Sequence, residues 1–126
     1  AAYARAFDVA LLPYRRVEPT FSGSSTRFYE HLAAGQPIVA TRGFEELLHK
    51  EPLLRLVDGA DEAAAWLTEL RARGFDDGLR ELRWRASREA TWQQRARLMQ
   101  EALAERMPYR ARAGDELHDQ AVLSPV

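Results

Sequence analysis

A helix stop that leads directly into a short apolar run constrains this fold more than any other feature. Gly35 suits the left-handed conformation that ends a helix, and Pro37 cannot continue one. Residues 38–41 follow as Ile-Val-Ala-Thr, a brief apolar and β-branched run. Such a run is typical of a strand that is buried on both faces. The sequence therefore predicts a helix over about 26–34 that feeds a buried strand.

Two further apolar runs and several helical segments give the same picture along the chain. The predicted strands are residues 8–13, 38–41 and 53–57. Besides 26–34, the predicted helices are the end of one over 1–7, a short one after the turn at 42–44, one over 62–73 with Asp61 as its N-cap, and a long C-terminal stretch over 77–106. Residues 14–23 are predicted to be a loop in which Pro19 enforces an extended backbone.

Strands that alternate with helices favour a parallel sheet. We therefore predict an α/β fold: a partial Rossmann-like parallel sheet of about three strands, with flanking helices and a long C-terminal helix. Residues 1–107 form the folded part, and the polar stretch 108–126 is predicted to be a disordered tail.

The C-terminal helical stretch carries two surface patterns. Thr91 and Gln94 resemble a capping box, so we expect a break near Thr91. After it, four apolar residues recur at heptad-like spacing: Trp92, Ala96, Met99 and Leu103. This stripe is expected to be part of an ordinary core or, as the alternative, a face that docks onto a partner surface. The arginines of this stretch are expected to form a solvated surface, or else a basic face for an anionic membrane or acceptor; they are Arg80, Arg83, Arg85, Arg88, Arg95 and Arg97.

The polar loop before the first predicted helix can form an anion site. Residues 22–26 are Ser-Gly-Ser-Ser-Thr, which have little bulk, and the first backbone N–H groups of a helix lack partners. Arg27 can add a bidentate charge contact to a phosphate. Glu30 lies one turn after Thr26, and a carboxylate that only accepts hydrogen bonds suits the two hydroxyls of a ribose.

A simpler interpretation of the same residues is open. Ser24, Ser25 and Thr26 can serve only to cap the helix, and Arg27 and Glu30 can be a solvated surface pair.

Composition excludes several classes of function. The 126 residues have a net charge of -1, which gives no bulk attraction to nucleic acid or to an anionic membrane. There is no cysteine, and no run approaches the ~20 apolar residues that span a bilayer. The histidines His31, His49 and His118 have no zinc-ligand spacing, so no metal site is predicted.

The run DVALLPYR, the Ser/Thr-rich loop and RFYEHLAAGQPIVAT together resemble the C-terminal donor domain of GT-B glycosyltransferases, most closely the large retaining group called family 4. The residues that match its pattern are Asp8, Val9, Leu11, Pro13, Glu30, Leu32, Ala33, Gly35, Pro37, Val39 and Ala40. The resemblance extends more weakly to about Leu103.

The resemblance implies roles for single residues. Glu30 matches the glutamate that holds the nucleotide ribose, and Ser24, Ser25 and Thr26 match the backbone that contacts the donor diphosphate. Many members carry another glutamate eight residues before the ribose glutamate, near the donor sugar. That position is Ser22 here, followed by Gly23, so this chain departs from the family where the sugar would lie.

The resemblance also implies a function and partners. It implies a cytoplasmic hexosyltransferase, with peripheral contact to the inner membrane as an option, that transfers the sugar of a nucleoside-diphosphate donor without a cofactor, metal or protein nucleophile. The chain would be the C-terminal part of that enzyme, inactive alone, with the acceptor domain and the basic residues that stabilise the leaving diphosphate upstream. Catalytic residues are therefore not assigned here. The alternative is a non-catalytic nucleotide-binding or structural α/β module.

Overall fold

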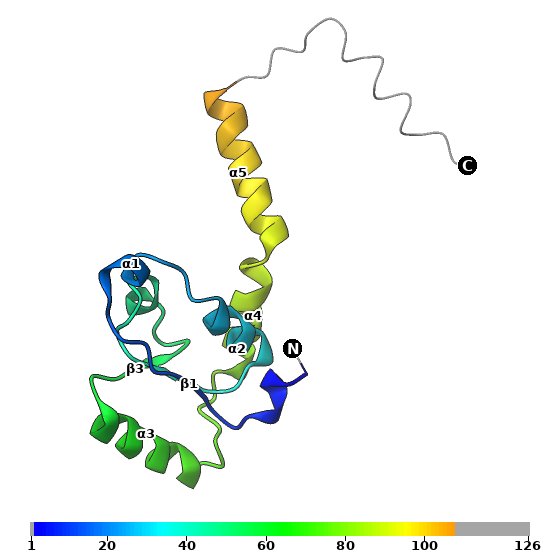
Figure 1. The fold of residues 1–126 in the computed structure, drawn as a ribbon. Helices are drawn as coiled ribbons and strands as arrows, with labels where there is room; N and C mark the ends of the chain where they lie inside the picture. The colour runs from blue at the N-terminus through cyan, green and yellow to red at the C-terminus, as the bar shows by residue number, and fades with distance from the viewer. Residues whose placement is uncertain (1, 108–126) are drawn as a thin grey trace, which may run out of the picture. The chain divides into compact units, whose positions relative to one another are not determined.

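The structure, a computed structural model, describes residues 2–107 and contains a three-stranded parallel sheet with helices around it (Figure 1). The strands lie in chain order as β1 (Ala10–Leu12), β2 (Ile38–Ala40) and β3 (Arg55–Leu56). Ala10 is opposite Ile38 and Ala40 is opposite Leu56. The predicted α/β class and the parallel sheet of about three strands are therefore confirmed.

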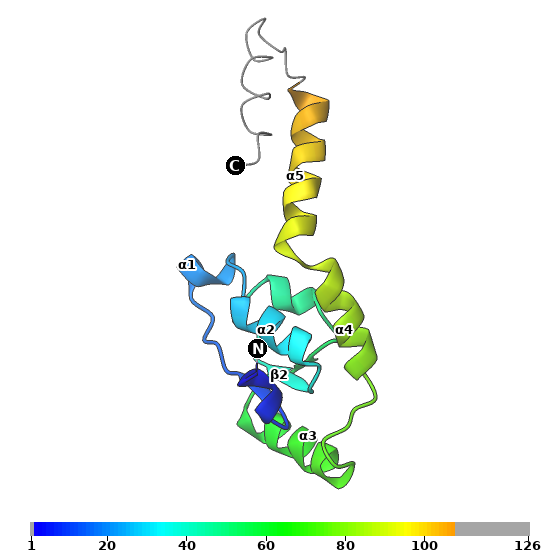
Figure 2. The ribbon, with the colours of Figure 1, turned by 90° about the vertical axis from the view of Figure 1, so that its right-hand side faces the viewer.

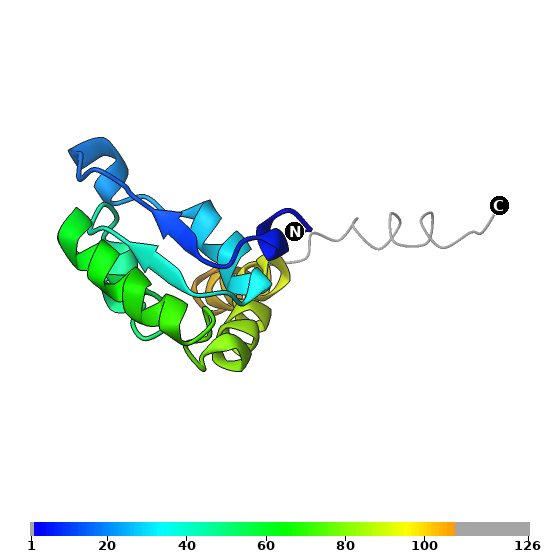
Figure 3. The same cartoon turned by 90° about the horizontal axis from the view of Figure 1, so that it is seen from below.

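The chain divides into two units, Ala1–Thr91 and Trp92–Val126, and the sheet belongs to the first. Helices of the first unit are η1 (Ala4–Ala6), α1 (Glu18–Phe21), α2 (Thr26–Ala34), η2 (Glu46–His49), α3 (Ala60–Ala72) and α4 (Arg80–Glu89), where η marks a 3-10 helix. α2 and α3 lie on opposite faces of the sheet (Figure 2 and Figure 3). α4 packs against α2.

The main core lies between the sheet and α2. Side chains of a strand alternate between its two faces, so every second residue of each strand reaches this core. From the strands the core includes Ala10, Leu12, Ile38, Ala40 and Leu56, and from the helices it includes Phe28, Leu32 and Leu47. Phe28 and Leu32 are fully buried, which fixes the face that α2 turns to the sheet.

The predicted helix stop is confirmed. α2 ends at Ala34, and Gly35 has a φ of 87° in the left-handed region. A Cβ atom at Gly35 would lie 2.5 Å from Nε1 of Trp84, so the close packing of α4 also requires glycine here. The left-handed backbone and the close contact with Trp84 therefore both require glycine at position 35.

Two local predictions are wrong. Residues 14–23 are not all loop, because α1 (Glu18–Phe21) forms with Pro19 in its first turn, where a missing N–H costs nothing. Asp61 is not the N-cap of α3, because the helix begins at Ala60 and its N-cap is Gly59. Glu62 instead accepts a hydrogen bond of 2.9 Å from the backbone N–H of Asp58.

Arg83 is buried, although the sequence analysis counted it among the arginines that lie on the surface of the C-terminal helical stretch. Its side chain is 1% exposed and forms a bidentate ion pair with Asp77. Its guanidinium also donates to the carbonyl oxygens of Leu53, at 2.7 Å, and Gly35, at 3.3 Å. These four contacts allow a charged group to be buried, because they give acceptors to four of its five N–H donors and pair its charge with a carboxylate. Arg83 therefore joins α4 to the end of α2 and to the segment before β3.

The described part of the second unit is α5 (Trp92–Arg106), and the predicted break near Thr91 is confirmed. None of its residues is buried, and Trp92 and Met99 are strongly exposed. The apolar stripe of Trp92, Ala96, Met99 and Leu103 is therefore not part of a core among residues 2–107. The predicted disordered tail, residues 108–126, lies outside the described residues. Within 2–107, no helix has the length and apolar character needed to cross a membrane.

Candidate functional site

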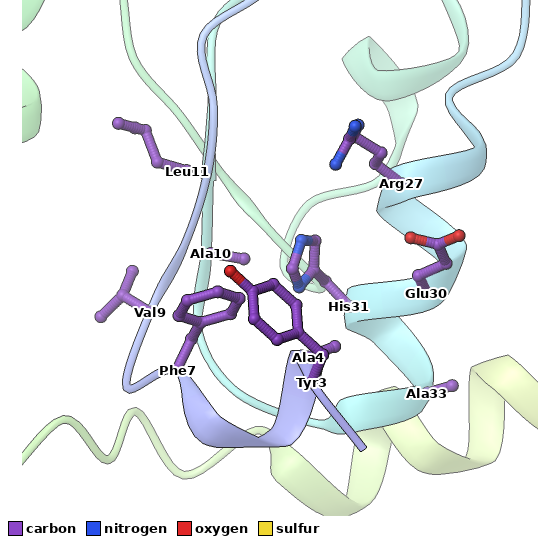
Figure 4. Close-up of a pocket in the computed structure, with 10 residues that line it drawn as sticks. All are labelled: Tyr3, Ala4, Phe7, Val9, Ala10, Leu11, Arg27, Glu30, His31 and Ala33. Atoms are coloured by element: carbon purple, nitrogen blue, oxygen red, sulfur yellow. The ribbon is translucent and has the colours of Figure 1, made fainter. Parts of the chain in front are cut away.

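A cavity of about 730 Å³ opens between α2, β1 and the segment before β1 (Figure 4). α2 contributes the polar side chains Arg27, Glu30 and His31 to its lining. Tyr3 and Phe7, which flank η1, contribute aromatic rings. Figure 4 shows Arg27 and His31 pointing from α2 toward β1. The cavity therefore combines a cation, a carboxylate, an imidazole and an aromatic surface.

The aromatic surface is formed by two rings that support each other. The rings of Tyr3 and Phe7 meet edge to face, with centroids 4.9 Å apart and an interplanar angle of 88°. Tyr3 is 79% exposed and Phe7 is 41% exposed. Exposed aromatic faces of this kind can stack with a flat apolar group of a ligand.

Arg27 and Glu30 do not neutralise each other. They lie three residues apart on α2, and both line the cavity. Among residues 2–107, the ion pairs within 4 Å include neither side chain. Among these residues Arg27 and Glu30 therefore form no ion pair, and because both side chains are exposed, their interpretation as solvated surface charges stays open beside that of a ligand site.

Ser25 has the structural role that the simpler interpretation gives it. Its hydroxyl oxygen accepts a hydrogen bond of 3.3 Å from the backbone N–H of Phe28 and caps α2. The same hydroxyl donates to the hydroxyl of Tyr14 at 3.2 Å, and Ser25 is 2% exposed. The N–H groups of Thr26 and Arg27, in the first turn, have no acceptor within the helix itself. The anion-binding capacity of this helix start is thus in its backbone and in Arg27.

The rest of the predicted loop lies apart from the cavity wall. Ser22 is the C-cap of α1, and the N–H of Gly23 donates to the carbonyl of Thr20 at 3.0 Å. Ser24 is exposed just before the cap of α2. The wall drawn in Figure 4 comes instead from η1 and its flanks, β1 and α2. The structure therefore brings Arg27 and Glu30 onto one cavity and leaves residues 22–26 outside its lining, at and before the start of α2.

Tyr14 organises this end of the sheet, which the sequence analysis missed. Its hydroxyl bonds Ser25, and its ring meets that of Phe44 edge to face at 4.6 Å. A Cβ atom at Gly43 would lie 2.3 Å from Cβ of Tyr14, so Gly43 allows this close approach. Tyr14 thereby ties the loops after β1 and β2 to the start of α2. The available signal was an aromatic residue directly after the Pro that ends a strand.

His31 is the second residue that the sequence analysis missed, since it was considered only as a metal ligand. Its Nδ1 lies 3.4 Å from Nε2 of Gln36. Burial lowers the pKa of His31; Glu30 raises it, and Arg27 lowers it further. The residues that the structure describes contain no group of three or more His, Cys, Asp or Glu side chains suited to a metal.

Comparison with known proteins gave no match: no protein-family description fits this chain, and no curated protein or solved structure was found to be similar to it.

Proposed function

We propose that the cavity beside α2 binds the nucleoside diphosphate of a nucleotide-sugar donor. The observation that carries this proposal is that Arg27 and Glu30 line one cavity without pairing with each other. A guanidinium matches the geometry of phosphate oxygens, and a carboxylate accepts from the two hydroxyls of a ribose. One face of α2 therefore offers both contacts that a nucleotide requires.

The proposal assigns each part of that ligand to a contact in the cavity. In this proposal the diphosphate lies at Arg27, the residue of the first turn of α2 that lines the cavity. The ribose lies at Glu30, one turn further along. Tyr3 and Phe7 give the base an aromatic surface. A cavity of about 730 Å³ falls within the range of ~300–1,000 Å³ that small-molecule sites occupy.

From the resemblance we propose further that the chain is the C-terminal, donor-binding part of a retaining glycosyltransferase of the GT-B type. Catalysis then consists of orienting the donor and stabilising the departing diphosphate. In this proposal Arg27 and Glu30 of this chain orient the donor. The glycosyl group passes to an acceptor that binds elsewhere in the same protein.

The alternative function, a non-catalytic nucleotide-binding or structural α/β module, is favoured by one observation. Ser25, in the loop that matches the diphosphate contact, is buried and uses its hydroxyl to cap α2 and to bond Tyr14. If the loop is purely structural, Glu30→Ala changes stability slightly and ligand binding not at all.

The test is calorimetric titration of UDP and GDP into the full-length gene product, in wild-type and Glu30→Ala forms. Loss of the ribose contacts is expected to weaken binding about tenfold or more, since a hydrogen bond to a charged group contributes ~1.5–3 kcal/mol. Glu69→Ala, a change of an exposed carboxylate on α3, is the matched control. Circular dichroism checks that each variant is folded.

Equal nucleotide binding in wild type and Glu30→Ala contradicts the ribose assignment. Failure of both nucleotides to bind the wild type contradicts the donor site as a whole. Release of UDP or GDP from a nucleotide sugar separates the enzyme from the non-catalytic module, because only the enzyme breaks the glycosyl–phosphate bond.

A further inference from the structure

We propose that His31 is a further ligand-binding residue of this cavity: its neutral ring carries the proton on Nε2, which donates to a phosphate oxygen of the nucleotide, and Gln36 holds the ring in that tautomer. The inference rests on the proposed nucleotide site. It adds a residue to the site that neither the sequence pattern nor the resemblance indicated.

His31 lines the same cavity as Arg27, one helical turn later on α2. It lies four residues after Arg27, so the two side chains follow one another along the same face of α2. In Figure 4 both extend from α2 toward β1 into the same space. The His31 ring lies 6.4 Å from that of Phe7, measured between centroids. His31 is therefore, with Glu30, one of the two polar side chains that α2 adds to the cavity one turn after Arg27.

Gln36 determines which nitrogen of His31 carries the proton. Gln36 is 4% exposed, and its amide nitrogen donates to the carbonyl oxygen of Ala4. The same nitrogen lies 3.4 Å from Nδ1 of His31, within hydrogen-bond distance. An amide nitrogen only donates, so Nδ1 accepts and the proton of the neutral ring resides on Nε2.

The opposite orientation of the Gln36 amide is disfavoured by its surroundings. Reversing the amide would place Oε1 against the carbonyl oxygen of Ala4, so that two acceptors would face each other. In the observed orientation Oε1 is buried and has no hydrogen-bond partner among the described residues. The oxygen of the Gln36 amide therefore lacks a hydrogen bond, while its nitrogen contacts both Ala4 and His31.

The charges around His31 favour a neutral donor. Burial is the largest influence on its pKa and lowers it, and Arg27 acts in the same direction, whereas Glu30 opposes them. Tyr3, from the segment before β1, is the other titratable side chain lining the cavity. The neutral ring offers one N–H to the ligand without adding a second cation beside Arg27.

The first experiment observes the tautomer in the free protein. Two-bond ¹H–¹⁵N NMR spectra of the full-length gene product are compared with those of His31→Gln to assign the His31 ring. The expected result at neutral pH is a protonated Nε2 and an unprotonated Nδ1. Gln36→Glu, which places an acceptor opposite Nδ1, is expected to move the proton to Nδ1 or to charge the ring. A protonated Nδ1 in the wild type overturns the proposal.

The second experiment measures the contact to phosphate, with UDP and uridine as probes. His31→Phe is expected to weaken UDP binding about tenfold, as for the loss of one hydrogen bond to a charged group, and to change uridine binding little. His31→Gln keeps an amide N–H near the position of Nε2 and is expected to retain most of the affinity. Glu30→Ala is expected to weaken both probes, because uridine keeps the ribose.

The outcomes separate this inference from the proposed function. If UDP binds wild type and His31→Phe equally but Glu30→Ala poorly, the role of His31 is refuted and the nucleotide site stands. The same holds if His31→Gln, although folded, binds as poorly as His31→Phe. If UDP does not bind the wild type, both proposals fall.

Discussion

Replacing Arg83 by methionine is expected to destabilise the first unit more than any change to a surface arginine. The side chain is 1% exposed, and its partner Asp77 is 14% exposed. Methionine fills much of the space but leaves the Asp77 carboxylate without its guanidinium. It also removes the donors that satisfy the carbonyl oxygens of Leu53 and Gly35.

The expected loss of stability follows from the groups that Arg83→Met leaves without a partner. Removing one partner of a buried ion pair costs about 3–5 kcal/mol, because the remaining charge stays desolvated. That is a large part of the ~5–15 kcal/mol by which a domain is stable. Replacing both partners, as in Arg83→Met with Asp77→Leu, leaves no buried charge and is expected to recover a substantial part of the loss.

Urea unfolding followed by far-ultraviolet circular dichroism measures these differences. Arg88→Met is the matched control, since Arg88 lies on the same helix and pairs with Glu81 at 3.6 Å while both are about two-thirds exposed. An exposed pair contributes about 0–1 kcal/mol, so this control is expected to shift the midpoint little. Equal losses in Arg83→Met and Arg88→Met would refute the assignment of Arg83 as a buried structural group.

Acid unfolding gives an independent readout of the same pair. Burial raises the pKa of Asp77, but the hydrogen bond and charge of Arg83 outweigh it, so the pKa lies below its usual 3.8. The folded wild type therefore keeps this contribution above pH 3.8 and loses it as the pH falls through the lowered pKa. Without Arg83 only the backbone hydrogen bonds from Leu79 and Asp77 oppose the effect of burial on the pKa of Asp77, and the variant is expected to lose stability at a higher pH.

Three further predictions use the same unfolding measurements. Gly35→Ala is expected to cost about 2–4 kcal/mol, from left-handed backbone strain and a clash with α4, whereas Gly74→Ala has strain alone and is expected to cost ~1–2 kcal/mol. Ser25→Ala, which removes the cap of α2, is expected to cost about 1 kcal/mol, and Ser24→Ala close to nothing; equal effects would contradict the cap. Burial lowers the pKa of His31 in the folded state, so stability is expected to fall as the pH drops below 6.5, and His31→Gln should lack this dependence.

The sequence predicts those parts of the fold whose causes are local. Gly35 and Pro37 end α2, and the β-branched run after them becomes β2, because each residue acts through its own backbone preference. α1 was missed since it has four residues, too few to show a helical period, and its proline suggested extension. Asp61 was a plausible N-cap, but α3 begins two residues earlier than predicted, and Gly59 is its N-cap.

The missed parts of the site depend on contacts between distant residues. Arg83 reaches Gly35 across 48 positions, and no periodic pattern identifies one buried arginine among several exposed ones. His31 becomes part of the cavity only because Gln36 and the segment before β1 fold around it. Arg27 and Glu30 were predicted from helix spacing, and the structure adds that they share a cavity. Their role toward a nucleotide stays a prediction.

The hydrogen bond between Tyr14 and Ser25 has a consequence for how this chain can diversify. It joins the two ends of a surface segment, residues 15–24, across 11 positions. With both ends held, the segment can lengthen at small thermodynamic cost, since doubling a loop adds only ~0.6 kcal/mol of closure entropy. Residues 15–24 are therefore the place where this fold can accept insertions or exchanged loops, while Arg27 and Glu30 keep their positions on α2.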